Sequence, residues 1–158
     1  MSTNTERDLK LCRAIYEHKQ RVSYYLNLLI HSLQWRSLQH DNSKLEPEEF
    51  DAYSSQMDEF CTHEFGSPGY VKAKETIADA VNHHYMCNSH HPEHYSNGID
   101  GMDLVDVIEM ICDWKAATTN NPKAPGTMQK SFDYAVAKYG ITPQLANVIL
   151  NTIENYKM

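Results

Sequence analysis

The sequence predicts an all-α fold in a single domain. Apolar residues recur every three or four positions along most of the chain, which is typical of helices that pack one face against a core. No segment shows the alternation of a half-buried strand, and we find no repeat or low-complexity tract. We therefore expect five or six helices in one domain over residues 1–158, with residues 1–7 as a flexible N-terminus.

The first expected helix runs from about Asp8 to Leu33. Its apolar positions form one stripe: Leu11, Ile15, Val22, Leu26, Leu29 and Leu33. At about 100° per residue, His18 lies within this stripe and His31 lies on the opposite face. His18 is therefore either a core histidine with one hydrogen-bond partner or an inward-pointing ligand.

A short connection, residues 34–39, leads to the doublet His40-Asp41. Both side chains of the doublet can bind a metal, and Lys44, three residues on, can meet an anion. The plainer alternative is that Asp41 or Ser43 caps the next helix and that Lys44 is an exposed lysine at its start.

The second helix is expected over residues 47–60, because a proline followed by acidic residues suits a first helical turn. A Gly-Ser-Pro-Gly loop at 66–69 separates it from a third helix at 70–84. His84 extends the apolar face of this third helix, whereas His83 lies about 100° away. We therefore expect His84, and not His83, to point inward.

Residues 85–101 are expected to be irregular, because Pro92, Gly98 and Gly101 prevent one continuous helix. Five of the nine histidines of the chain fall between His83 and His94. A long irregular segment in a compact domain is often functional. A solvated, histidine-rich surface loop without a function would have the same sequence pattern.

A fourth helix is expected from Met102 or Asp103, a suitable N-cap, to Ala117. Asp106, Glu109 and Asp113 line the face opposite its apolar side chains. This acidic strip is either a solvated face or a set of buried carboxylates, and buried carboxylates need cations or metals. Periodicity alone leaves both interpretations open.

The C-terminal part is expected to contain a loop at 120–126 and two further helices. The first covers residues 128–139 and ends at Gly140, and the second begins at Thr142-Pro143. We expect neither this loop nor the loop at 66–69 to separate domains.

Composition excludes several classes of protein. The net charge of −7 argues against a broad duplex nucleic-acid surface, but a metal could still supply local positive charge for a small phosphorylated ligand. No apolar run approaches the length of a membrane span, and the N-terminus does not read as a signal peptide, so we expect a cytoplasmic protein. The cysteines lie far apart and are expected to be reduced thiols: Cys12, Cys61, Cys87 and Cys112.

Four candidate ligands occur at three separate places in the chain, in this order: His18, the doublet His40-Asp41, and Asp113. A helical histidine, a His-Asp doublet and a distant helical aspartate resemble the HD-domain superfamily of metal-dependent phosphohydrolases. Three stretches, at 40–44, 83–94 and 109–117, resemble more closely a small HD-like family of unknown function that is known mainly from phages and bacteria. The resemblance covers the chain from about Tyr16 to Tyr156 and implies an HD-like helical bundle.

The resemblance implies one or two divalent transition metals, chosen from Mn, Fe, Co, Ni and Zn. The implied ligands are His18, His40, Asp41 and Asp113, with His84, His90 and His91 as further ligands if a second metal binds. The implied catalytic residues are Asp41, Lys44 and Glu109, where Glu109 either orients a ligand histidine or acts as a general acid or base. The implied substrate-binding residues are Lys44, His91 and His94.

The function implied by the resemblance is hydrolysis of a phosphate ester or phosphodiester, with a nucleotide or a nucleotide-derived signal as the expected substrate. Two alternatives remain: a di-iron oxygenase, which needs His84 together with His90 or His91, and a non-catalytic protein that binds a nucleotide or a partner. We expect no duplex nucleic acid and no membrane as partners, and a homo-oligomer is compatible with the sequence. The expected setting is a bacterial cytoplasm, or that of a phage-infected host.

Overall fold

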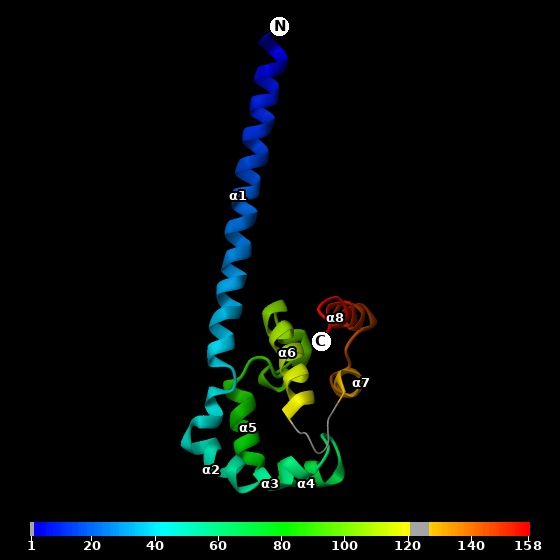
Figure 1. Cartoon of the computed structure of the whole chain (residues 1–158). Helices are drawn as coiled ribbons and strands as arrows, with labels where there is room; N and C mark the ends of the chain where they lie inside the picture. The colour runs from blue at the N-terminus through cyan, green and yellow to red at the C-terminus, as the bar shows by residue number, and fades with distance from the viewer. Residues whose placement is uncertain (1, 121–126) are drawn as a thin grey trace. The chain divides into compact units, whose positions relative to one another are not determined.

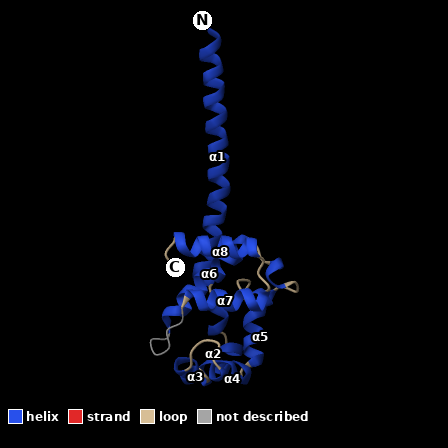
Figure 2. Ribbon diagram, turned by 90° about the vertical axis from the view of Figure 1, so that its right-hand side faces the viewer, coloured by secondary structure: helices blue, strands red, loops and turns tan. Residues whose placement is uncertain are grey.

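The computed structural model describes residues 2–120 and 127–158. Over these residues the chain forms eight α-helices and three 3-10 helices, with no strand (Figure 1, Figure 2). The prediction of an all-α fold is confirmed. Most of the loop expected at 120–126 lies outside the described residues. The chain divides into two compact units, Met1–Leu38 and Gln39–Met158.

The first unit consists of helix α1 (Ser2–Gln39), whose last residue already belongs to the second unit. The helix starts earlier than expected, so residues 2–7, for which we expected a flexible segment, are helical. The apolar stripe is exposed along this helix, with Leu11 at 59% and Leu29 at 52%. A single helix offers no second element within its own unit against which to bury that stripe.

Four helices stand where the sequence predicted two: α2 (Pro47–Ser55), α3 (Met57–Thr62), α4 (Pro68–Thr76) and α5 (Ala78–Cys87). The expected helix at 47–60 breaks at Gln56, where φ is −108°, and the helix at 70–84 breaks at Ile77, where φ is −116°. The expected number of five or six helices was therefore too low. Neither break has a proline or glycine, so the apolar spacing alone did not reveal it.

The remaining α-helices lie close to their predicted positions: α6 (Leu104–Asn120), α7 (Met128–Tyr139) and α8 (Pro143–Asn155). Three short 3-10 helices were not predicted: η1 (Asn42–Leu45), η2 (Pro92–His94) and η3 (Gly98–Gly101). Asp103 caps α6 as predicted, since its Oδ1 accepts hydrogen bonds from the backbone N–H groups of Val105 (2.7 Å) and Asp106 (2.9 Å). Gly140 ends α7 in the left-handed region, with φ 64°.

Two apolar clusters hold the second unit together. The larger one joins α6, α7 and α8 through seven buried residues: Val107, Met110, Ile111, Phe132, Ala135, Ile141 and Ile149. The smaller one is centred on Ile77, Ala80 and Val81, against which Tyr53 and Tyr85 pack. The helices that supply functional side chains, α5 and α6, therefore belong to different clusters.

The four cysteines are free thiols, as the sequence predicted. Within the described part of the chain, none of the helices combines the length and the apolar character needed to cross a bilayer.

Candidate metal centre

The carboxylate of Asp41 lies where the chain leaves α1 and enters η1. Asp41 has a left-handed backbone conformation, with φ 57° and ψ 16°, which is uncommon for a residue with a side chain. It makes no capping hydrogen bond through its side chain, and the Ser43 hydroxyl instead lies 3.1 Å from His84 Nδ1. These contacts argue against a simple helix cap. The Lys44 ammonium pairs with Asp41 Oδ2 at 2.6 Å.

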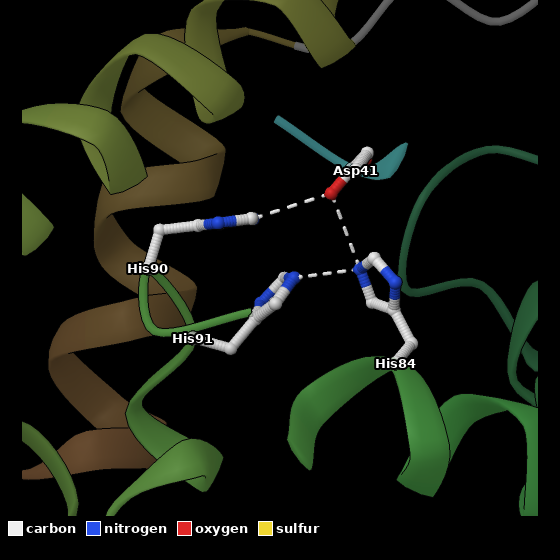
Figure 3. Close-up of side chains that lie close together, drawn as sticks. All are labelled: Asp41, His84, His90 and His91. Carbon is white, nitrogen blue, oxygen red and sulfur yellow. Dashed lines mark hydrogen bonds and ion pairs between the residues drawn. The ribbon is translucent and has the colours of Figure 1, made fainter. Parts of the chain in front are cut away.

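One group of metal-binding atoms gathers around Asp41 Oδ1 (Figure 3). His84 Nε2, from α5, lies 3.3 Å from this oxygen, and His90 Nε2, from the following loop, lies 3.4 Å from it. His91 Nε2 lies 3.0 Å from His84 Nε2. One carboxylate oxygen and three imidazole nitrogens thus converge within 4.8 Å of one another.

A second group lies on the other side of the same carboxylate. His40 Nε2 lies 3.7 Å from Asp41 Oδ2 and 3.6 Å from Asp113 Oδ1. The doublet and the distant helical aspartate, predicted to meet, do meet here. Asp41 therefore belongs to both groups and offers one oxygen to each.

Glu109, one helical turn before Asp113 on α6, orients two of these histidines. Its Oε1 lies 2.9 Å from His40 Nδ1 and 3.3 Å from His90 Nδ1. A carboxylate only accepts hydrogen bonds, so it favours the N–H on Nδ1 of both rings and leaves both Nε2 atoms as potential ligands. This position favours the orienting role for Glu109 over that of a general acid or base.

Glu49 on α2 plays the same part for His84. Its side chain is fully buried (0% exposed), with Oε2 3.0 Å from His84 Nδ1 and Oε1 2.8 Å from His83 Nδ1. With Nδ1–H donated to Glu49, His84 Nε2 is directed at Asp41 and His91. Sequence reasoning missed Glu49, which it had assigned only to the acidic first turn of a helix. The available signal was its place four residues before Tyr53, on the inward face of α2.

The charges around His40 make the centre attractive to a cation. Hydrogen bonding to Asp113 and then to Glu109 raises the pKa of His40 to about 10. Burial on its own would raise the pKa of Asp41, but the neighbouring His84 side chain and the Lys44 charge outweigh it and hold that pKa below its usual range. Burial and then the neighbouring His90 and His84 lower the pKa of His91 to about 2, so His91 stays neutral.

The donor atoms fit a divalent transition metal. Among the side chains that the structure describes, the buried nitrogen and oxygen atoms without a hydrogen-bond partner are Asp41 Oδ1 and His90 Nε2. They face each other, and a buried polar atom without a partner is costly. Imidazole with carboxylate suits Mn, Fe, Co, Ni or Zn, and a cation shared by these atoms would satisfy both.

The preference for His84 over His83 is confirmed, because the His84 side chain is 3% exposed and His83 is 35% exposed. Two of the predicted histidines lie outside both groups. His94 Nδ1 lies 3.1 Å from the Tyr85 carbonyl oxygen, to which it donates. His18 lies on α1, in the other unit, with its side chain exposed. Both groups form from the second unit alone, and the role of His18 as a ligand stays a prediction.

The acidic strip of α6 runs from a buried aspartate to two partly exposed carboxylates. Asp106 is 1% exposed and accepts hydrogen bonds from the Ser89 hydroxyl (2.7 Å), the Tyr95 hydroxyl (2.7 Å) and the Asp103 backbone N–H (2.9 Å). It thereby holds the loop that carries His90 and His91. Of the two interpretations that periodicity left open, the structure supports a buried carboxylate at Asp106, whereas Glu109 is 13% exposed and Asp113 is 29% exposed.

A comparison with protein families matches residues 7–155, which is nearly the whole chain, to DUF5662. The chain belongs to the DUF5662 family. The description of DUF5662 is a family of unknown function, so membership assigns no activity. Comparisons with curated proteins and with solved structures gave no match. The residues 40–113 that form the two groups all lie inside the part of the chain that matches DUF5662.

Proposed function

We propose that this DUF5662 protein is an HD-type metal-dependent phosphohydrolase that cleaves a phosphate ester or phosphodiester, with a nucleotide or nucleotide-derived signal as substrate. The observation that carries the proposal is the Asp41 carboxylate shared between two groups of donor atoms. His84, His90 and His91 stand with Oδ1, and His40 and Asp113 stand with Oδ2. The resemblance to HD-domain proteins adds the reaction class, which the geometry alone does not define.

Each of these residues has a defined role in the proposed hydrolysis. A bound divalent metal would acidify a water molecule and neutralise phosphate charge. Asp41 would hold one or two such ions, and Lys44, whose ammonium lies 2.6 Å from Asp41 Oδ2, would hold a phosphate oxygen beside them. Glu109 and Glu49 would keep the ligand histidines in the tautomer that binds a metal.

The test is a panel of phosphate esters, phosphodiesters and nucleotides incubated with purified protein and Mn²⁺ or Co²⁺. We expect turnover of at least one nucleotide by the wild type and only background turnover by Asp41→Asn. Asparagine tolerates the left-handed backbone of this position, so the variant removes the charge without forcing a new turn. Asp51→Asn, at an exposed position on α2, is the matched control. A panel on which the wild type and Asp41→Asn behave alike contradicts the proposal.

A second candidate is a di-iron oxygenase, favoured by the number of donors. His84, His90 and His91 all approach one oxygen of Asp41, and with His40 and Asp113 the two groups supply enough ligands for two irons. Iron analysis of anaerobically purified protein separates the candidates. About two irons per chain, with O₂-dependent activity that is lost on iron removal, would favour the oxygenase.

A further inference from the structure

Lys74, on α4, is a half-buried lysine that forms no ion pair with the acidic side chains that the structure describes. Among the described residues, no carboxylate lies within ion-pair distance of its ammonium group, and its hydrogen bond goes to the Tyr85 hydroxyl. Charged side chains removed from water are normally paired. An ammonium group has three donors, so two N–H groups of Lys74 are available to an anion.

Tyr85 adds a third donor at the same place. Its hydroxyl oxygen accepts from Lys74, and no described acceptor takes its own proton. Burial and the nearby charge of Glu93 raise the pKa of the Tyr85 hydroxyl above its ordinary value, so the proton stays in place at neutral pH. Two adjacent groups, the Lys74 ammonium and the Tyr85 hydroxyl, therefore hold donor hydrogens for which the described chain provides no acceptor.

The position of these donors relates them to the metal centre. The Tyr85 ring neighbours both Lys74 and His91: its centroid lies 5.0 Å from the Lys74 ammonium and 5.0 Å from the centroid of the His91 ring. Tyr85 also lies 6.3 Å from the His84 ring. The same aromatic ring is therefore a neighbour of the Lys74 ammonium and of two of the candidate ligands.

Lys138, on α7, increases the positive charge beside Lys74. Burial and then the charge of Lys138 lower the pKa of Lys74, which reflects the cost of holding two cations near each other away from water. Glu93 partly compensates, but its carboxylate is already engaged by the Lys138 ammonium at 2.5 Å and by the Tyr139 hydroxyl at 3.0 Å. A bound anion would offset the charge that Glu93 leaves uncompensated.

We propose that Lys74 and the Tyr85 hydroxyl, flanked by Lys138, form an anion subsite that binds a second phosphate group beside the one held at the metal centre. The substrate would then carry a phosphoanhydride chain, as in a nucleoside di- or triphosphate or an inorganic polyphosphate, and not a single monoester. The subsite is a binding feature in its own right, and its link to a substrate rests on the proposed phosphohydrolase function.

The test is calorimetric titration of the full chain, treated with a chelator and freed of it, with inorganic phosphate and with tripolyphosphate at fixed low salt. We expect tripolyphosphate to bind more tightly than phosphate, and Lys74→Met to weaken it by about 10-fold or more, as expected for lost charge-assisted hydrogen bonds. Tyr85→Phe should weaken it by a smaller factor, and it still tests the subsite if Lys74→Met fails to fold.

Lys72→Met is the matched control, because Lys72 is an exposed lysine on the same helix. If Lys72→Met and Lys74→Met weaken tripolyphosphate binding equally, the loss comes from the general loss of positive charge, and the proposed subsite is overturned. Wild type that fails to bind tripolyphosphate, or Lys74→Met that binds it as the wild type does, would overturn it too. Lys74-dependent binding without any turnover on the substrate panel would leave the subsite standing and count against the phosphohydrolase. Turnover that is unaffected by Lys74→Met would leave the phosphohydrolase standing and count against the subsite.

Discussion

At the scale of single residues, Asp41 combines an unusual backbone with an unusual set of neighbours. A side-chain-bearing residue in the left-handed region costs on the order of 1–3 kcal/mol unless its surroundings compensate, and such residues are frequent at functional sites. At Asp41 the conformation presents both carboxylate oxygens to different donor groups. The strain and the shared carboxylate thus occur at one position.

Glu49 provides the sharpest test of how the histidines are oriented. We expect Glu49→Gln to lower the affinity for Mn²⁺ or Co²⁺ by about 10- to 100-fold, because the amide can no longer guarantee the Nδ1–H tautomer of His84. Calorimetric titration with the metal measures this directly. Glu48→Gln, one residue away and exposed, should bind the metal as the wild type does. Unchanged affinity in Glu49→Gln would mean that its contact with His84 serves only to fill the core.

His40 predicts how the metal-free protein responds to pH. Its pKa is raised from an ordinary value of 6.5 to about 10 by Asp113 and Glu109, so the folded state holds its proton more tightly than the unfolded state. The stability this contributes is complete below about pH 6.5 and is lost as pH rises towards 10.

Melting temperatures of chelator-treated wild type and His40→Gln, measured from pH 6 to pH 10, check this expectation. The advantage of the wild type should be largest at the acidic end and should shrink as pH rises. A constant or growing advantage would contradict the assignment of a protonated His40, and His31→Gln, at an exposed position on α1, controls for general effects of losing a histidine.

Helical geometry predicted part of the centre and could not predict the rest. An angle of about 100° per residue was enough to choose His84 over His83, because both lie on one helix. The partnership of Glu49 with His84 depends on how α2 packs against α5, across 35 residues of sequence. Periodicity carries no information on such a contact.

At the scale of elements, the number of helices was predicted too low because periodicity carries no information on tertiary contacts. The bounds of α7 agreed with the prediction, since Thr127 and Gly140 are explicit start and stop signals. The breaks at Gln56 and Ile77 carry no such signal, because both residues are acceptable within a helix. They follow from tertiary packing, and two expected helices became four.

The end of α7 offers a quantitative check at this scale. Gly140 has φ 64° and open space where a Cβ would stand, so a substitution there meets conformational strain and no steric clash. We expect Gly140→Ala to lower the free energy of unfolding by about 1–2 kcal/mol, the cost of an L-residue in the left-handed region. Urea unfolding measures it. Gly140→Asn should lose less, and an equal loss in both variants would argue against the left-handed cap.

At the scale of the whole molecule, the second unit contains both donor groups and the Lys74 subsite. Helices from its two apolar clusters supply different ligands: α5, from the smaller cluster, carries His84, and α6, from the larger one, carries Asp113. A metal held between them would link the clusters. Metal binding should therefore stabilise the folded unit by mass action as well as support chemistry.

The most direct test of the shared carboxylate is the anomalous scattering of crystals of the full chain soaked in Mn²⁺. We expect anomalous density within bonding distance of Asp41 Oδ1, beside His84 and His90, and, if two ions bind, a second peak beside Oδ2, His40 and Asp113. Crystals of Asp41→Asn should lack these peaks. Manganese bound only elsewhere on the chain, or peaks at this place that persist in Asp41→Asn, would contradict metal binding by the shared Asp41 carboxylate.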